Sequence, residues 1–226
     1  MPKPQIAILH YSAPPVIGGV ESTIEAQARL LADYGYPVKI LAGRGAGFDA
    51  RVPLELTPTL DSTHAFVLQV QRKLAVGSVS GDFHALTAAI HRHLTAQFQG
   101  IDVCIVHNAL TLHKNLALTN ALHELARTRS LRLIGWCHDF AWTDPLYVNE
   151  LHAGVPWNLL REKWEGVQYV VVSADRRQEL ARLLNAPEQA IVVAPPGLDC
   201  FGFGETRPAC AISLGEPRGI HSHEME

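Results

Sequence analysis

The sequence predicts an α/β protein built on a doubly wound parallel sheet, and two patterns lead to this prediction. Short apolar runs alternate with segments of helical periodicity over most of the 226 residues, as in a parallel sheet covered by helices. Helix-capping residues also fall between these runs. Gly35 follows the first helical segment where a left-handed C-cap is expected, and Ser173 precedes the last one as an N-cap.

The expected elements follow from these patterns in chain order. We expect strands at residues 5–10, 38–42, 102–107, 132–136, 169–173 and 190–194. Helices are expected at residues 20–34, 82–98, 114–129 and 174–184, with a further helix at 63–74 in a less regular stretch. The repeat of strand and helix ends after residue 194. We therefore expect the doubly wound domain to span residues 1–199, with residues 200–226 as an irregular C-terminal tail.

Charge and composition argue against several classes of partner. The chain carries 19 Lys and Arg against 22 Asp and Glu, so it has no basic footprint for nucleic acid. No stretch approaches the roughly 18 apolar residues of a transmembrane segment, which leaves only peripheral membrane contact open. The four cysteines form no C-x-x-C pair and are expected to be buried thiols in a reducing compartment. We therefore expect a cytoplasmic protein.

A pair of glycines opens the first helix directly after the first strand. The first N–H groups of a helix are unpaired and its dipole is positive there, so Gly18 and Gly19 predict a phosphate at the helix mouth. A dinucleotide site does not fit, because eight residues separate His10 from Gly19, no third glycine follows, and the second strand ends without an acidic residue. The alternative interpretation is a turn that needs glycine only for its conformation.

Polar side chains follow three of the expected strands. His10 ends the first strand, His107 and Asn108 end the third, and His138 and Asp139 follow the fourth. Doubly wound sheets bind their ligands at the carboxyl ends of the strands, so these residues are candidates for a direct role. They are alternatively polar caps of strand ends beside water.

Five segments, in this order, carry a resemblance to a known family. They are "GGVE" at residues 18–21, "LADYGYPVKILAGRG" at 31–45, "CHDF" at 137–140, "VVVSADRRQELARLL" at 170–184 and "IVVAPPGLD" at 191–199. Together they resemble the N-terminal domain of the retaining, family-four-type glycosyltransferases. These enzymes have the GT-B fold of two Rossmann-like domains, and the chain is expected to be the N-terminal half of such a fold.

The resemblance implies a substrate and a set of site residues. In that family the N-terminal domain mostly holds the acceptor, and its glycine-rich turn faces the diphosphate of a nucleotide sugar bound mainly by the second domain. The nucleotide sugar is the donor substrate, and neither a cofactor nor a metal is implied. The expected roles are catalytic for His138 and Asp139, donor-phosphate binding for Gly18 and Gly19, and acceptor or substrate binding for His10, Glu21, His107, Asn108, Trp142 and Ser173.

Three of these substrate residues have plain structural alternatives. Glu21 lies in the first helical turn, where the helix dipole favours a carboxylate in any protein. Trp142 lies in the long connection at residues 138–157 and is a candidate platform for a sugar ring or another planar acceptor. Core packing is expected for Trp136 and Trp164, and Ser173 is also the expected helix cap.

The sequence leaves three functions open. The first is a glycosyltransferase half whose donor-binding C-terminal domain is missing, either through truncation or because a partner chain carries it; such a chain is expected to turn over poorly alone. The second is a metal-dependent hydrolase in which His10, His107, His138 and Asp139 converge on one divalent ion. The third is a non-catalytic half of a two-chain transferase.

Overall fold

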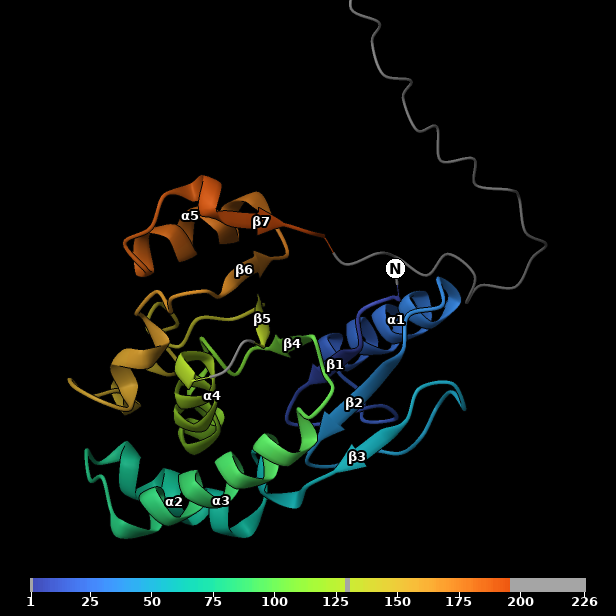
Figure 1. The fold of residues 1–226 in the computed structure, drawn as a ribbon. Coiled ribbons are helices and arrows are strands. Elements are labelled where there is room, and N and C mark those ends of the chain that lie inside the picture. Colours follow the sequence, from blue (N-terminus) through green and yellow to red (C-terminus); the bar gives the residue numbers. More distant parts are fainter. Residues whose placement is uncertain (1, 129–130, 196–226) are drawn as a thin grey trace, which may run out of the picture.

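A computed structural model describes residues 2–128 and 131–195. It contains one sheet in which every pair of neighbouring strands is parallel, in the order β3-β2-β1-β4-β5-β6-β7 (Figure 1). This confirms the predicted doubly wound α/β fold. The strands are β1 (Ile6–Leu9), β2 (Val38–Ala42), β3 (Leu54–Leu56), β4 (Val103–His107), β5 (Arg132–Cys137), β6 (Gln168–Val171) and β7 (Ile191–Val193).

The helices also lie where the sequence predicts them, with ends shifted by no more than two residues. They are α1 (Gly19–Asp33), α2 (Ala65–Ala75), α3 (Gly81–Gln97), α4 (Leu116–Thr128) and α5 (Ala174–Leu183). The long connection at 138–157 contains a short 3-10 turn at Val148–Glu150, and another turn follows at Trp157–Leu160. The expected domain boundary at residue 199 and the tail at 200–226 lie outside the described residues.

One strand was not predicted. β3 pairs with β2 in the register Ile40 with Leu54 and forms one edge of the sheet. It is only three residues long and its side chains are half-buried or exposed. The alternation of Leu54, Glu55 and Leu56 covers only three residues, which is too short to indicate a strand from the sequence.

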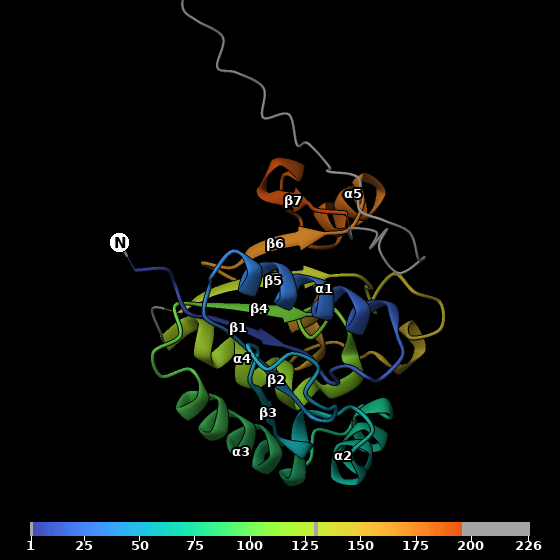
Figure 2. The same ribbon diagram turned by 90° about the vertical axis from the view of Figure 1, so that its right-hand side faces the viewer.

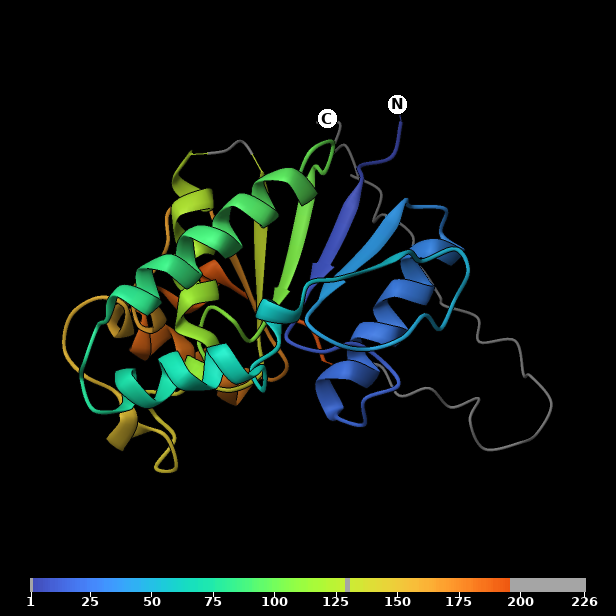
Figure 3. The ribbon, with the colours of Figure 1, turned by 90° about the horizontal axis from the view of Figure 1, so that it is seen from below.

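The sheet separates two layers of helices. Figure 3 shows α1 on one side of the strands and α2, α3 and α4 on the other, and Figure 2 shows the strands following one another from β3 to β7. Successive residues of β1 point to opposite faces: Ile8 packs with Ile24 of α1, whereas Leu9 belongs to the core shared with α3 and α4. All four side chains of β1 are buried, as expected for a central strand covered on both faces.

The chain reverses its direction across the sheet at β1. From β1 it proceeds outward through β2 to β3, and it then returns to place β4 on the other side of β1. Ile6 accordingly pairs with Val38 on one side and with Val103 on the other. A crevice forms at the carboxyl ends of strands at such a switch point, and this is where doubly wound proteins bind ligands.

Both predicted helix caps are confirmed. Gly35 follows α1 with a positive φ of 71°, a conformation that glycine adopts without steric cost. Ser173 is the N-cap of α5, where its hydroxyl accepts a hydrogen bond from the backbone N–H of Arg176 at 3.2 Å.

Two cysteines lie in the core, and both are buried free thiols. Burial raises the pKa of Cys137 to about 12 and that of Cys104 still further, so both remain protonated. This confirms the expectation of buried thiols for these two residues. Within residues 2–128 and 131–195, no helix is long and apolar enough to cross a membrane.

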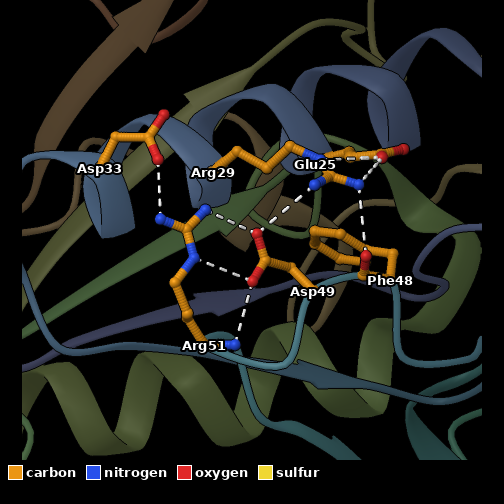
Figure 4. Close-up of polar contacts among 6 residues, drawn as sticks. All are labelled: Glu25, Arg29, Asp33, Phe48, Asp49 and Arg51. Atoms are coloured by element: carbon orange, nitrogen blue, oxygen red, sulfur yellow. Dashed lines mark hydrogen bonds and ion pairs between the residues drawn. The ribbon is translucent and has the colours of Figure 1, made fainter.

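The connection from β2 to β3 is attached to α1 by a cluster of charged side chains (Figure 4). The carboxylate of Asp49 accepts hydrogen bonds from the backbone N–H of Arg51 at 3.0 Å and from its guanidinium at 3.0 and 2.7 Å. Arg29 of α1 donates to the same carboxylate at 3.4 Å and to the carbonyl of Phe48 at 3.2 Å. The hydrogen bonds from Arg51 hold the pKa of Asp49 well below its ordinary value.

Candidate functional site

The predicted site residues gather at the carboxyl edge of the sheet. His10 follows β1, His107 ends β4 and His138 follows β5, and these three strands are consecutive neighbours through β4. A cavity of about 570 Å³ opens beside them. It is lined by Gly19, Val20 and Thr23 of α1, by His138 and Asp139 after β5, and by Val172 after β6.

The two glycines at the mouth of α1 have different reasons to be glycine. Gly18 is the N-cap in an extended conformation, and a Cβ there would collide with Oε2 of Glu21. Gly19 is the first helical residue, and a Cβ there would meet nothing within 4 Å. Neither residue has a positive φ, so the alternative that this turn needs glycine for its conformation is wrong. Packing explains Gly18, whereas no contact among the described residues 2–128 and 131–195 explains Gly19.

Glu21 folds back beneath the glycine turn. Its side chain is buried, and the hydroxyl of Ser12 donates a hydrogen bond to Oε1 at 2.5 Å. The same oxygen lies 3.9 Å from Nε2 of His10. Glu21 therefore does more than respond to the helix dipole, because it joins the first turn of α1 to the residues that follow β1.

Three histidines lie side by side across β1, β4 and β5. Nδ1 of His10 donates to the backbone carbonyl of His107 at 3.0 Å. Nδ1 of His107 lies 3.1 Å from Nε2 of His138, and the two rings are stacked with centroids 5.4 Å apart. The other nitrogen of His107, Nε2, lies 3.1 Å from Oε1 of Gln27 on α1. His107 is thus a fully buried link between α1 and His138.

Burial keeps these histidines uncharged. It lowers the pKa of His10 to about 4, and it lowers the pKa of His107 well below the ordinary value of 6.5. The pKa of His138 is lowered in the same direction, mainly by burial and against the attraction of Asp139 and Glu21. At neutral pH each ring therefore has one N–H donor and one acceptor nitrogen.

Asn108 shapes the turn that carries His138 and Asp139. It has a left-handed backbone with φ of 58°, which asparagine tolerates better than most residues. Its Oδ1 accepts from the backbone N–H groups of His138 at 2.8 Å and of Asp139 at 3.2 Å. Its Nδ2 donates to the carboxylate of Asp139 at 3.0 Å. Asn108 therefore positions both predicted catalytic residues, while its expected contact with substrate stays a prediction.

Trp142 and Ser173 lie among other partners. The indole N–H of Trp142 donates to the carbonyl of Trp157 at 3.0 Å, and the guanidinium of Arg161 lies 3.9 Å from the centre of its ring. Neither Trp142 nor Ser173 lines the cavity of about 570 Å³, and Ser173 caps α5. Their binding roles stay predictions.

The other tryptophans follow the predicted core packing only in part. Trp164 is buried as expected. Trp136 is half-buried, and its ring stacks against that of His107 with centroids 5.8 Å apart. It therefore forms part of the wall behind the site.

Gln27 was not predicted as a site residue, although its spacing of four residues from Thr23 and eight from Gly19 places all three on one face of α1. Gly19 and Thr23 line the cavity and Gln27 contacts His107. The face of α1 that begins at the glycine turn therefore follows the site for two turns.

A second cavity of about 540 Å³ lies at the opposite, amino edge of the sheet, between the segments that precede β1, β4 and β5. Its lining includes Lys3, Asp102 and Arg132 and none of the predicted site residues. We place the functional site at the carboxyl edge, because ligands of doubly wound folds bind there.

The geometry does not gather the residues of the proposed hydrolase around a common point. Both ring nitrogens of His107 have hydrogen-bond partners, and Nδ1 of His10 is bonded to a backbone carbonyl. Across the part of the chain that the structure describes, no group of three or more His, Cys, Asp or Glu side chains is arranged to hold a metal ion. The arrangement therefore gives the hydrolase hypothesis no support.

Fold and site together define a class of protein, a Rossmann-like α/β domain with its ligand site beside a glycine-initiated helix at the switch point. Residues 17–200 match the model of the family described as Glycosyltransferase Family 4. The chain belongs to this family, and the resemblance noted in the sequence is confirmed.

Solved structures of glycosyltransferases share the fold at low identity. WaaG, a glycosyltransferase involved in lipopolysaccharide biosynthesis, matches with a TM-score of 0.53 and 12% identity over 85% of this chain and 45% of its own. Apo UGT2 of Phytolacca americana matches with a TM-score of 0.45 and 13% identity, over 86% and 52% of the two chains. An alpha-glucosyltransferase in complex with UDP-glucose and DNA containing an abasic site matches with a TM-score of 0.44 and 13% identity, over 88% and 44%.

These matches bear on fold and on length. The likeness to WaaG confirms the expected fold. The chain spans about half the length of the solved structures that it matches. No curated protein matches the chain in sequence.

Proposed function

We propose that this chain is the acceptor-side half of a glycosyltransferase that moves a sugar from a nucleotide-sugar donor to an acceptor. Membership of Glycosyltransferase Family 4 supports the reaction class. The cavity at the carboxyl edge supports the location, because it joins the mouth of α1 to His138 and Asp139. The observation that carries the proposal is that Gly19, whose Cβ position is open among the described residues, lines this cavity.

Gly19 is best explained by a ligand that approaches the backbone closely. The turn makes no side-chain capping hydrogen bond at Gly18, so the first N–H groups of α1 remain available to a ligand. The helix dipole favours an anion there, and a missing Cβ lets that anion come near the backbone. The diphosphate of a nucleotide sugar has this chemistry, and we assign it to this turn.

His138 and Asp139 complete the proposed site on the far side of the cavity. A neutral imidazole forms hydrogen bonds to sugar hydroxyls without repelling the positive charge that develops on a reacting sugar. Asp139 presents a carboxylate beside it, held by Asn108 and by the hydroxyl of Thr111, which donates to its backbone carbonyl at 2.8 Å. We propose that these two residues act on the sugar and acceptor, while the glycine turn acts on the phosphates.

A second domain is part of this proposal. In the family that the chain resembles, the nucleotide is held mainly by a C-terminal domain, and this chain covers 45% of the length of WaaG. We propose that a donor-side domain works across the cavity from Gly19 and His138. The competing hypothesis of a non-catalytic half predicts activity only when a separate transferase chain is present.

Donor binding to the full 226-residue chain tests the proposal. Ligand-observed NMR with UDP-glucose, UDP-N-acetylglucosamine and GDP-mannose detects even weak binding. We expect at least one of these donors to bind, and we expect Gly19→Ala to weaken that binding about tenfold, or about 1.4 kcal/mol. The added Cβ meets nothing within the chain, so the fold is expected to stay unchanged.

Gly81→Ala is the matched control. Gly81 is likewise the first residue of a helix, α3, and a Cβ there also meets nothing within 4 Å. It lies outside the cavity lining, so donor affinity should stay the same. Equal affinity of the Gly19→Ala variant and the unchanged chain, or no binding of any of the three donors, would overturn the proposal.

A further inference from the structure

A continuous line of hydrogen-bonding groups connects α1 to the cavity through the buried ring of His107. It begins at Gln27 on α1, whose Oε1 lies 3.1 Å from Nε2 of His107. It continues from Nδ1 of His107 to Nε2 of His138 over another 3.1 Å. His138 lines the cavity, and among the described residues its Nε2 faces His107 while its Nδ1 has no hydrogen-bond partner.

Each member of this line limits the proton positions of the next. The histidines are neutral because burial disfavours their charged forms, so each has one donor and one acceptor nitrogen. An amide oxygen only accepts, so the nitrogen of His107 that faces Gln27 must donate. The other nitrogen of His107 then accepts, and Nε2 of His138 must donate to it.

We propose that Gln27 and His107 are positioning residues that hold His138 in its Nε2–H tautomer. In this tautomer Nδ1 of His138 presents a lone pair to the cavity and accepts a hydrogen bond from a hydroxyl group of the substrate. The nature of that substrate rests on the proposed function, whereas the tautomer itself rests only on the described contacts.

The proposal assigns different chemical groups of the ligand to the two sides of the cavity. A lone pair repels the oxygen atoms of a phosphate and attracts a hydroxyl donor. The carboxylate of Asp139 lies beside the same histidine and adds negative potential on that side. The phosphates therefore belong at the mouth of α1 and a hydroxyl of the sugar or acceptor at His138.

NMR of the unliganded full chain, labelled with ¹⁵N-histidine, reads the tautomer directly. Two-bond ¹H–¹⁵N spectra at pH 7 distinguish a protonated from an unprotonated ring nitrogen. We expect Nε2 to carry the proton in both His107 and His138. If the amide of Gln27 were turned over, every proton in the line would reverse, and a protonated Nδ1 on His138 would overturn the proposal.

Two substitutions test whether Gln27 sets this state. Gln27→Glu retains an oxygen that only accepts, so His138 should stay in the Nε2–H form. Gln27→Met removes the acceptor at similar length, and we expect the Nδ1–H form of His138 to become detectable. Gln69→Met, at an exposed position of α2, is the matched control and should leave the histidine spectrum unchanged.

The outcomes separate this proposal from the proposed function. An amide ¹H–¹⁵N spectrum of each variant shows whether it is folded, and the measurement on the unchanged chain stands even if Gln27→Met is not. An unchanged tautomer ratio in a folded Gln27→Met variant would overturn the role of Gln27. The spectra need no ligand, so failure to bind a nucleotide sugar would contradict the proposed function and leave the tautomer assignment intact.

Discussion

At the scale of single residues, Asn108 shows how one side chain organises the site. Its left-handed backbone turns the chain after β4, and its amide holds the backbone of His138 and Asp139 as well as the Asp139 carboxylate. Asparagine suits this position because it combines tolerance of positive φ with a side chain that both donates and accepts.

Replacing Asn108 should separate these two contributions. Asn108→Ala loses the hydrogen bonds and leaves at positive φ a residue that tolerates this conformation less well than asparagine, so we expect the free energy of unfolding to fall by about 3 kcal/mol. Asn108→Gly loses only the hydrogen bonds and should be less destabilised by about 1 kcal/mol. Urea denaturation measures both variants. Equal losses would show that backbone conformation contributes nothing at this position.

The residues of the site differ in how readily the sequence reveals them. His10, His107 and His138 were predicted to lie close together because they end parallel strands, and the structure places them in a row of pairwise contacts. The role of Asn108 was not predictable, because a positive φ and three short contacts depend on how β4 and β5 are placed side by side.

At the scale of elements, the connection between β2 and β3 combines a buried apolar residue, Val52, with a cluster of charged contacts to α1. Asp49 lies at the centre of the cluster in Figure 4, between Arg51 of its own loop and Arg29 of α1. Arg51 also reaches Asp33 at the end of α1, at 2.8 Å, but both of these side chains are well exposed. The Asp49 carboxylate is thus the contact that joins this loop to both Arg51 and Arg29.

Asp49→Asn should loosen the loop without unfolding the domain. Loss of the charge weakens the hydrogen bonds from both arginines, so hydrogen–deuterium exchange of residues 44–53 should become faster while the sheet stays protected. Asp33→Asn is the control at the exposed end of the same cluster, and exposed pairs contribute little. Equal exchange in the Asp49→Asn variant and the unchanged chain would contradict this account.

The elements themselves were largely predictable, with one instructive exception. Strands that helices cover on both faces appear in the sequence as continuous apolar runs. Gly35 marks the end of α1, and Ser173 marks the start of α5. β3 shows neither a continuous apolar run nor a capping residue, because it is a short edge strand that is defined by its pairing with β2. Pairing of this kind is a property of the assembled sheet and is absent from the local sequence.

At the scale of the whole molecule, the buried histidines make stability depend on pH. Burial lowers the pKa of His10 to about 4, and it lowers the pKa values of His107 and His138 below 6.5. In the unfolded chain all three take up protons as the pH falls through about 6.5, whereas the native protein resists protonation. The free energy of unfolding should therefore fall between pH 6.5 and 4.

Urea denaturation at pH 8, 6 and 5 measures this loss. His10 alone should account for about 2 kcal/mol at pH 5, and His10→Gln should flatten the pH dependence. The lowered carboxylate pKa values of Asp49 and Asp82 act in a separate window, because their contribution is lost only as the pH falls below about 4. A stability that is the same at pH 8 and pH 5 would contradict the assigned neutral histidines.

The position of β1 between β2 and β4 also governs when the sheet can assemble during synthesis of the chain. His10 and His107 contact one another across 97 positions in the sequence. β1 therefore cannot pair with β4 until that length of chain has been synthesised. At about 5–20 residues per second, the delay is on the order of 5–20 s. During this time β1, β2 and α1 are available to one another, but β1 presents an unpaired edge. The histidine cluster can thus form only after the nascent chain has passed His138, and β6 and β7 follow later still.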